Sequence, residues 1–332
     1  MCLWCVSVCG GRARKRNQAT GGRTLGIEEY KSTTPKAEYL KKLDLEWAFG
    51  RVPETRDFVF GSFLSGTVGA LCGAGAAGKS FWALEMAMAI ASQGVEGGDL
   101  LRLLPSRPGR VVYVAAEESY NELSYRAHMI GRHIPIEARA AIAEWLDIEV
   151  VEGRRINVLD DEYYNQLAQN LCGGARLVIL DTLSRIHLGE ENSNRDMAIL
   201  ISRLEKLSYE TGAAVLYLHH ISKATALGGL GGEQQAARGA SALIDNARWC
   251  GNLTGMSKTE AEKLSTDAYS RLPIGPERRR YFCKFTVSKE NYAITDGDTW
   301  YQRHEGGVLL PIKLYGAVED EQSKRGKERE RK

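Results

Sequence analysis

Four apolar runs divide most of the chain, and segments that favour helices separate them. The apolar runs, each of the length of a buried strand, are 67–72, 110–116, 177–181 and 213–220. A shorter fifth run lies at 148–151. The segments that predict helices are 81–91, 121–132, 136–146, 160–171 and 196–211. Strands that alternate with helices predict an α/β fold with a mostly parallel central sheet flanked by helices.

The pattern changes toward the C-terminus. Residues 281–314 contain short stretches typical of strands, separated by turns, and predict antiparallel β strands added to the sheet. Residues 1–35 are polar, glycine-bearing and basic, and predict a disordered leader. Residues 317–332 predict a charged disordered tail. We therefore expect a single domain over 36–316, with a glycine-rich mobile loop at 223–235.

A phosphate-binding pattern lies directly after the first apolar run. Residues 73–80 read GAGAAGKS, which fits the P-loop pattern G-x-x-x-x-G-K-[ST] between a strand and a helix. Glycines let the backbone approach a phosphate closely, Lys79 would reach the β- and γ-phosphates, and Ser80 would bind Mg²⁺. A glycine-rich turn without a ligand is the alternative. The predicted ATP-binding residues are Gly73, Ala74, Gly75, Ala76, Ala77, Gly78, Lys79, Ser80 and Phe81.

Three polar residues end later strands of the predicted sheet. Glu117 follows the second apolar run, Asp181 ends the third and His220 ends the fourth. Ligands of open α/β sheets bind at the carboxyl ends of the strands, so these side chains are expected near the P-loop. Asp181 would hold Mg²⁺ through water, Glu117 would orient the attacking water, and His220 would sense the γ-phosphate. Taken singly, each has a structural alternative as a loop cap or a strand-end residue.

Composition narrows the classes of partner. The chain has 332 residues, 43% hydrophobic and 26% charged, with a net charge of only +2, so any nucleic-acid contact must come from local patches. No apolar stretch approaches the ~20 residues of a membrane helix. The basic residues near the start follow the apolar stretch, which is the wrong order for a secretory signal. We expect a cytoplasmic protein that does not contact membranes.

Two further groups of residues leave alternatives open. Cys2, Cys5 and Cys9 suit a partial metal or iron–sulfur site, but no fourth ligand is nearby, which favours a disordered leader or an artefactual upstream start. Arg238 and Arg248 follow the glycine-rich loop, and surface arginines are the ordinary interpretation. The functional interpretation of the loop is a flexible segment for single-stranded DNA.

Six segments carry a resemblance to a known family. They are GTVGALCGAGAAGKS, VVYVAAEE, LVILDTLSRIH, VLYLHHISKA, RGASALIDNARW and FTVSKENY. In this order, from about Gly66 to about Pro311, the chain resembles the RepA-type replicative helicases of IncQ-type broad-host-range plasmids, which are RecA-like, DnaB-type ring helicases. The resemblance implies a RecA-like P-loop NTPase domain, a homohexameric ring, and 5′-to-3′ unwinding of duplex DNA driven by ATP hydrolysis with Mg²⁺. It also implies single-stranded DNA and plasmid initiator or primase proteins as partners.

The resemblance assigns roles to individual residues. Lys79 matches the P-loop lysine, Glu117 the catalytic glutamate and Asp181 the Mg²⁺-associated acid. His220 matches the histidine that senses the γ-phosphate. Arg248 matches the arginine finger that the neighbouring subunit supplies.

Ser80 and Arg126 complete the assigned set, as the P-loop serine and as an arginine near the nucleotide. The chain departs from the family in two places. The leader has no counterpart, and residues 289–291 read Lys-Glu-Asn where DnaB-type proteins have Lys-x-Arg, which favours Arg248 as the finger. No primase-like or zinc-binding primase segment is present in the sequence.

Two other functional classes stay open at this point. One is a RecA-like DNA-binding ATPase that acts in recombination or plasmid regulation without unwinding. The other is a non-catalytic nucleotide-binding protein, which the presence of Lys79, Glu117 and Asp181 disfavours. The ATP site alone does not separate the first two, since related folds carry many functions.

Overall fold

The computed structural model describes residues 42–151, 153–154, 156–221, 243–294 and 297–318. The chain separates into two compact units, Met1–Glu54 and Thr55–Lys332. The described part of the first unit holds one short helix, α1 (Leu45–Phe49), which begins where the Asp44 carboxylate accepts the Trp47 N–H at 3.0 Å. The predicted leader, the loop at 223–235 and residues 319–332 of the predicted tail lie outside the described residues.

One large sheet organises the second unit. Its nine described strands have the order β12-β11-β10-β8-β3-β7-β6-β4-β5. Strands β8, β3, β7, β6, β4 and β5 run parallel to one another, whereas β10, β11 and β12 pair antiparallel. The parallel strands are β3 (Val68–Gly73), β4 (Val111–Ala115), β5 (Leu146–Val150), β6 (Leu177–Asp181), β7 (Ala214–His220) and β8 (Trp249–Gly255). The P-loop strand β3 thus lies at the centre of the sheet, with β7 and β8 on either side.

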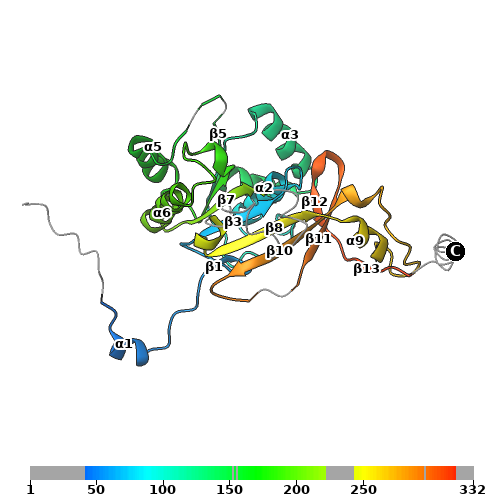
Figure 1. Ribbon diagram of the computed structural model, residues 1–332, viewed down its shortest axis with the longest axis horizontal. Helices are drawn as coiled ribbons and strands as arrows, with labels where there is room; N and C mark the ends of the chain where they lie inside the picture. The colour runs from blue at the N-terminus through cyan, green and yellow to red at the C-terminus, as the bar shows by residue number, and fades with distance from the viewer. Residues whose placement is uncertain (1–41, 152, 155, 222–242, 295–296, 319–332) are drawn as a thin grey trace, which may run out of the picture. The chain divides into compact units, whose positions relative to one another are not determined.

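Helices cover both faces of this sheet (Figure 1). One core contains α2 (Lys79–Ala91), α3 (Tyr120–Gly131) and α4 (Ile136–Trp145). The other core contains α5 (Asp161–Asn165), the π-helical η1 (Gln166–Leu171) and α6 (Asn194–Thr211). Successive strand residues point to opposite faces, so Leu71 of β3 packs in the first core while Ala70 and Cys72 pack in the second. The predicted α/β fold, with its mostly parallel sheet and flanking helices, is confirmed.

The antiparallel strands follow the parallel part of the chain and extend the sheet beyond β8, as the C-terminal pattern predicts (Figure 1). They are β10 (Phe282–Glu290), β11 (Thr299–Arg303) and β12 (Leu309–Pro311), with the short η4 (Glu305–Gly307) between the last two. Among the described residues, two strand pairs and three further short helices lie outside the main sheet. These are β1 (Phe58–Phe60) with β2 (Phe63–Leu64), β9 (Leu264–Ser265) with β13 (Tyr315–Gly316), η2 (Leu183–Arg185), α9 (Lys258–Lys263) and η3 (Arg279–Tyr281).

The P-loop helix α2 is buried on nearly all sides. It contains only two charged residues, and a helix that is apolar all round belongs in a core. Glu85 is one of these two, and both are buried: one carboxyl oxygen of Glu85 accepts the Leu309 N–H at 2.8 Å, and burial raises the pKa of Glu85 well above its usual range. Among the described residues, no helix combines the length and the apolar character that a membrane crossing requires.

An aromatic cluster joins α2 to the strands around it. The rings of Trp82 and Phe285 stack with centroids 4.5 Å apart, and those of Phe63 and Trp249 stack at 5.1 Å. Phe60 meets Phe63, Trp82 and Trp249 edge-on. Aromatic pairs of this kind contribute about 0.5–1.5 kcal/mol each beyond their buried area. The cluster therefore fixes the β1–β2 hairpin, the P-loop helix and β10 to one another.

The rings of this cluster leave no room for a side chain at Gly251. A Cβ built there would lie 2.6 Å from the Trp249 ring and 2.7 Å from the Phe285 ring. We predict that Gly251→Ala lowers the free energy of unfolding by about 1–3 kcal/mol because it overpacks the stacked rings. Gly255 lies in the same strand and its Cβ would meet nothing within 4 Å, so Gly255→Ala is the matched control. Equal stability of the two variants in denaturant titrations would contradict this packing argument.

Candidate nucleotide-binding and catalytic site

The P-loop connects the end of β3 to the start of α2, as its sequence predicts. Gly73 cannot carry a side chain, because a Cβ there would lie 2.5 Å from the Leu253 carbonyl oxygen of β8. Gly78 has φ 103°, a conformation that side chains disfavour. A Cβ at Gly75 would meet nothing within 4 Å, so packing within the described structure does not require this third glycine. The motif's first and last glycines are therefore the two that the local backbone needs.

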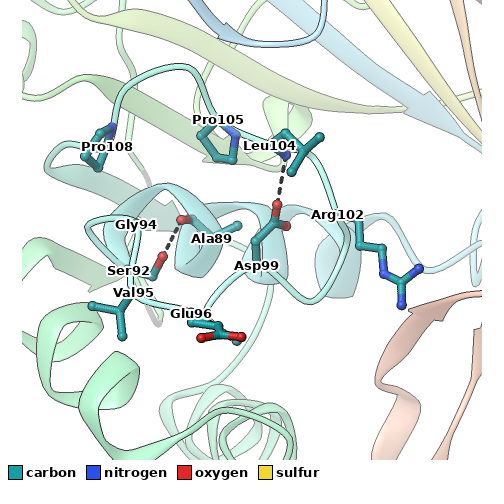
Figure 2. A pocket seen from close by; sticks show the side chains of 11 residues that line it. Ala89, Ser92, Gly94, Val95, Glu96, Asp99, Arg102, Leu104, Pro105 and Pro108 are labelled. Carbon is teal, nitrogen blue, oxygen red and sulfur yellow. Dashed lines mark hydrogen bonds between the residues drawn. The ribbon is translucent and has the colours of Figure 1, made fainter.

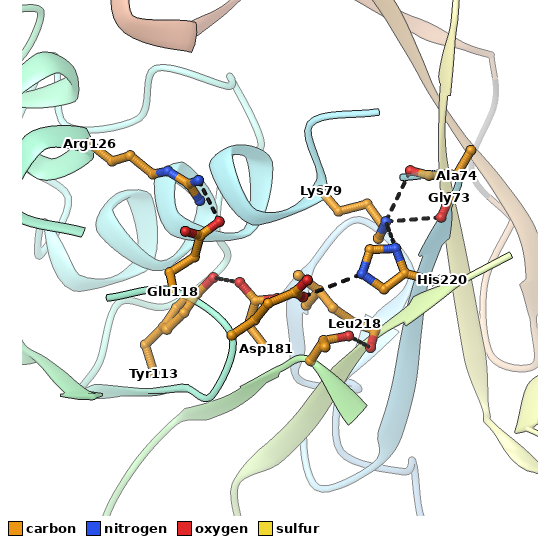
Figure 3. A network of polar contacts seen from close by, with 11 residues as sticks. Gly73, Ala74, Lys79, Tyr113, Glu118, Arg126, Asp181, Leu218 and His220 are labelled. Atoms are coloured by element: carbon orange, nitrogen blue, oxygen red, sulfur yellow. Dashed lines mark hydrogen bonds and ion pairs between the residues drawn. The ribbon is translucent and has the colours of Figure 1, made fainter. Parts of the chain in front are cut away.

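The Lys79 side chain turns toward the loop that precedes it. Its Nζ donates to the carbonyl oxygens of Gly73 at 2.9 Å and Ala74 at 3.1 Å, and lies 3.2 Å from Nδ1 of His220 (Figure 3). Burial lowers the pKa of Lys79, while the nearby Asp181 and Glu117 carboxylates oppose that shift. The lysine is thus held at the point where β3, α2 and β7 meet.

His220 connects Lys79 to Glu117. Nε2 of His220 lies 3.4 Å from a carboxylate oxygen of Glu117. Because the Lys79 ammonium can only donate, Nδ1 accepts, and the neutral imidazole then carries its proton on Nε2 and points it at Glu117. Both His220 and Glu117 are partly exposed to solvent. The structure therefore brings together three of the residues that the sequence singled out.

Asp181 lies buried beneath these residues, at the end of β6. Its carboxylate accepts the Tyr113 hydroxyl proton at 2.6 Å and is hydrogen-bonded to the Ser80 side chain. Burial raises the pKa of Asp181, and these two hydrogen bonds oppose the rise. A serine hydroxyl beside a carboxylate fits Mg²⁺, which prefers oxygen ligands and keeps several waters. No cluster of three or more His, Cys, Asp or Glu side chains suited to a metal occurs in the described part of the chain.

Arg126 is held in the wall of the site by two carboxylates. Its guanidinium donates to Glu118 at 2.5 Å and to Glu122 at 3.0 Å, and it lies 5.0 Å from the centroid of the Phe81 ring. Charged hydrogen bonds of this kind fix the arginine side chain in one orientation. Arg126 therefore lies beside the P-loop helix, with its charge already compensated.

These residues line a cavity of about 280 Å³ at the carboxyl ends of the strands. Its lining residues are Ala76, Gly78, Lys79, Ser80, Phe81, Glu117, Glu118, Arg126, His220 and Arg303. Sequence reasoning did not identify Glu118 or Arg303 as part of the site. Glu118 adjoins Glu117 and could have been found as the partner of Arg126, whereas Arg303 comes from β11 and belongs to no motif.

Arg248 lies at the amino ends of the strands, opposite the carboxyl ends that form the cavity. Its backbone N–H donates to the carbonyl oxygen of Val68, at the start of β3, and its side chain is exposed. Val68 and Gly73 are separated by the length of β3, about 17 Å at 3.3 Å per residue. Arg248 is therefore not part of the cavity formed by its own chain. Arg238 lies outside the described residues.

A different cavity, of about 310 Å³, lies at the C-terminal end of α2 (Figure 2). Its polar contacts are local, since Asp99 accepts the Leu104 N–H at 2.8 Å and Ser92 donates to the Ala89 carbonyl oxygen at 2.7 Å. It contains neither the glycine loop nor the strand-end acids. The chemistry-bearing side chains thus gather at the P-loop end of α2.

Tyr113 is one of two residues whose side chains hydrogen-bond the Asp181 carboxylate. We predict that Tyr113→Phe raises several-fold the Mg²⁺ concentration needed for half-maximal nucleotide binding, because it removes one hydrogen bond from a buried carboxylate. Tyr217→Phe is the matched control, since that buried hydroxyl donates to the Leu243 carbonyl oxygen at 2.7 Å, away from Asp181. Titration of a fluorescent nucleotide against Mg²⁺ measures the effect. An equal shift in both variants would show that Tyr113 acts only on the stability of the sheet.

One family model and two solved structures are similar to this chain. The family model described as an AAA domain matches residues 34–226, which is more than half of the chain. The RadB recombinase superposes with a TM-score of 0.45 at 12% identity, over 75% of this chain and 92% of that one. A KaiC-like protein of the hyperthermophilic archaeon Pyrococcus horikoshii OT3 superposes with a TM-score of 0.48 at 15% identity, over 79% of this chain and 100% of that one. The extent of the first match establishes that this chain belongs to the AAA domain family.

Proposed function

We propose that this protein is an ATP hydrolase that binds Mg²⁺–ATP in the 280 Å³ cavity. One observation carries the proposal: Lys79, His220 and Glu117 form a continuous chain of polar contacts, and the buried Asp181 interacts electrostatically with Lys79 and Glu117. These side chains come from three different strand ends and from α2. Their convergence on a glycine loop matches the requirements of phosphoryl transfer, in which positioning and charge stabilisation dominate.

The residues divide the reaction between them. The loop amides and Lys79 hold the phosphates, and Glu117 orients a water molecule and accepts its proton as the water oxygen attacks the γ-phosphorus. The bond between the γ-phosphorus and its bridging oxygen breaks, and its electron pair stays on the ADP that leaves. Mg²⁺, held by Ser80 and through water by Asp181, would neutralise charge on the phosphates. His220, placed between Lys79 and Glu117, would report whether a γ-phosphate is present.

We further propose that hydrolysis drives 5′-to-3′ unwinding of DNA by a homohexameric ring. The sequence resemblance supports this proposal, and so does a second cavity of about 430 Å³ that shares Glu117 with the nucleotide cavity. Arg154 and Arg185 line this second cavity and would offer cations to the phosphates of a single strand. A strand bound there would lie beside the residue that orients water, which would couple DNA to hydrolysis. Plasmid initiator or primase proteins are the proposed further partners, and the cytoplasm is the proposed location.

The runner-up function is a DNA-binding ATPase that acts in recombination or plasmid regulation without unwinding. Both functions need the same nucleotide site and the same affinity for single strands. Only the separation of strands distinguishes them.

Strand separation therefore tests the proposal. We predict that the purified chain unwinds a forked duplex when Mg²⁺–ATP is present. Glu117→Gln should bind ATP normally but hydrolyse it about 10²–10⁴-fold more slowly and fail to unwind, because the amide is not basic enough to activate water. Glu144→Gln, on the exposed surface of α4, is the control and should behave as wild type. DNA-stimulated hydrolysis without strand separation would favour the runner-up function.

The position of Arg248 gives a second prediction. Because this side chain is remote from its own P-loop, we expect it to act on ATP that a neighbouring subunit binds, as a permanently charged donor to phosphate oxygens. Arg248→Ala should then bind nucleotide and assemble but lose hydrolysis, by about 10³-fold or more if it acts like the arginine fingers of GTPases. Arg195→Ala, an exposed arginine of α6, is the matched control.

Mixing variants makes this prediction sharper. Lys79→Ala and Arg248→Ala should each be inactive, yet mixed rings contain interfaces where an intact Lys79 faces an intact Arg248. Hydrolysis should therefore return on mixing once subunit exchange has been demonstrated by an independent label. Exchange without recovered activity would place Arg248 outside the reaction.

A further inference from the structure

Arg303 enters the nucleotide cavity from a part of the chain that no motif marks. It is the last residue of β11, and its guanidinium donates to the carbonyl oxygens of Ala76, at 3.2 Å, and Ala77. A Cβ built on Gly78 would lie 2.8 Å from Nη2 of Arg303. The guanidinium therefore lies directly against the second half of the phosphate-binding loop.

The hairpin that carries Arg303 is fixed to the helices of the site. Gly307 packs so closely on the Phe81 ring that a Cβ would lie 2.8 Å from it, and Gly306 lies against Met129 of α3 in the same way, at 2.5 Å. The Leu309 N–H donates to the buried Glu85 of α2. A side chain on such a support loses little further conformational entropy when it binds a ligand.

Arg303 and Arg126, the two arginines of the cavity, differ in whether a carboxylate pairs with them. Arg126 is paired with two carboxylates, whereas within the described residues Arg303 has no carboxylate within 4.0 Å. Lys79, like Arg303, forms no ion pair with a carboxylate among the described residues. Lys79 donates to carbonyl oxygens at the start of the loop and Arg303 to those near its end. Two cations that form no ion pair among the described residues thus flank the loop, each bonded to neutral acceptors weaker than a phosphate oxygen.

We infer that Arg303 is a nucleotide-binding residue, supplied by the same chain, that contacts a phosphate group shared by ADP and ATP. The location of Arg303 along the loop indicates which phosphates it contacts. Arg303 lies against Gly78, where the loop becomes α2, and this part of a P-loop cradles the α- and β-phosphates. Arg303 would therefore leave Ala76 and Ala77 and donate its fork of N–H groups to phosphate oxygens. This inference rests on the proposed nucleotide site but is independent of DNA unwinding.

The competing role for Arg303 is structural. In that case the guanidinium braces the loop through its carbonyl oxygens and never contacts a ligand. The two roles differ in their dependence on salt, because a direct contact between a cation and a partly exposed phosphate is screened by ions whereas a bonded loop is not. They also differ in how the nucleotide-free protein responds to loss of the side chain.

The experiment measures ADP binding to the full chain by calorimetry at several salt concentrations. Arg303→Ala should bind ADP and a non-hydrolysable ATP analogue more weakly by about the same factor, roughly tenfold or more, and its ADP affinity should fall less steeply with salt than that of wild type. Arg303→Lys should be intermediate, since it keeps the charge and loses the fork. Gln302→Ala, the preceding residue of β11, faces the other side of the strand and should match wild type.

Each other outcome decides against the inference. Unchanged ADP affinity would show that Arg303 does not contact the nucleotide. Weaker binding with an unchanged salt dependence, together with a lower unfolding temperature of the nucleotide-free variant, would show that it only braces the loop. A loss for the ATP analogue alone would move the contact to the γ-phosphate and overturn the assignment made here. Wild-type protein that binds no ADP at all would overturn the proposed function itself together with this inference.

Discussion

The buried ammonium of Lys79 is the constraint on which the rest of the site depends. A charged group that is 5% exposed must recover its lost hydration, and Lys79 does so through the carbonyl oxygens of Gly73 and Ala74 and through His220. Those partners belong to the end of β3, the loop and the end of β7. The requirement for these bonds therefore holds three elements in register, and the same ammonium is placed where phosphates would bind.

The sheet supplies the second level of organisation. Its parallel strands end at one edge, so Glu117, Asp181 and His220 meet there although they are distant in sequence. Helices bury both faces, and the stacked rings of Trp82 and Phe285 fix the P-loop helix against the antiparallel strands. Two features thus position the loop: the sheet, from whose strand β3 the loop follows, and the aromatic cluster, which holds the helix α2 that the loop leads into.

Local patterns predicted most of this arrangement. The apolar runs identified the long parallel strands, and the glycine pattern identified the loop, because both signals lie within a few consecutive residues. The helix α9 was not predicted, although Ser257 and Glu260 form the capping box that marks its start. The β1–β2 pair was also missed, since strands of three and two residues give too little alternation to detect.

Long-range contacts explain what the sequence did not predict in the site. Arg303 reaches the loop only because β11 pairs with β10, which pairs with β8, and no residue near Arg303 signals that chain of pairings. The hydroxyl of Tyr113 could not be assigned to Asp181 for the same reason, since their contact requires β4 and β6 to be neighbours in a known register. Spacing along the chain predicts which residues end strands, whereas the pairing of strands decides which of them touch.

The proposal that this site hydrolyses ATP rests on the arrangement around Lys79. The most direct measurement is the steady-state rate of phosphate release from ATP by the purified chain with Mg²⁺, compared with that of Lys79→Ala under identical conditions. We predict a Mg²⁺-dependent rate for wild type and its loss in the variant, with the unfolding transition of the variant preserved. A wild type that releases no phosphate with or without DNA, or a correctly folded Lys79→Ala that hydrolyses ATP at the wild-type rate, would contradict the assignment of this loop.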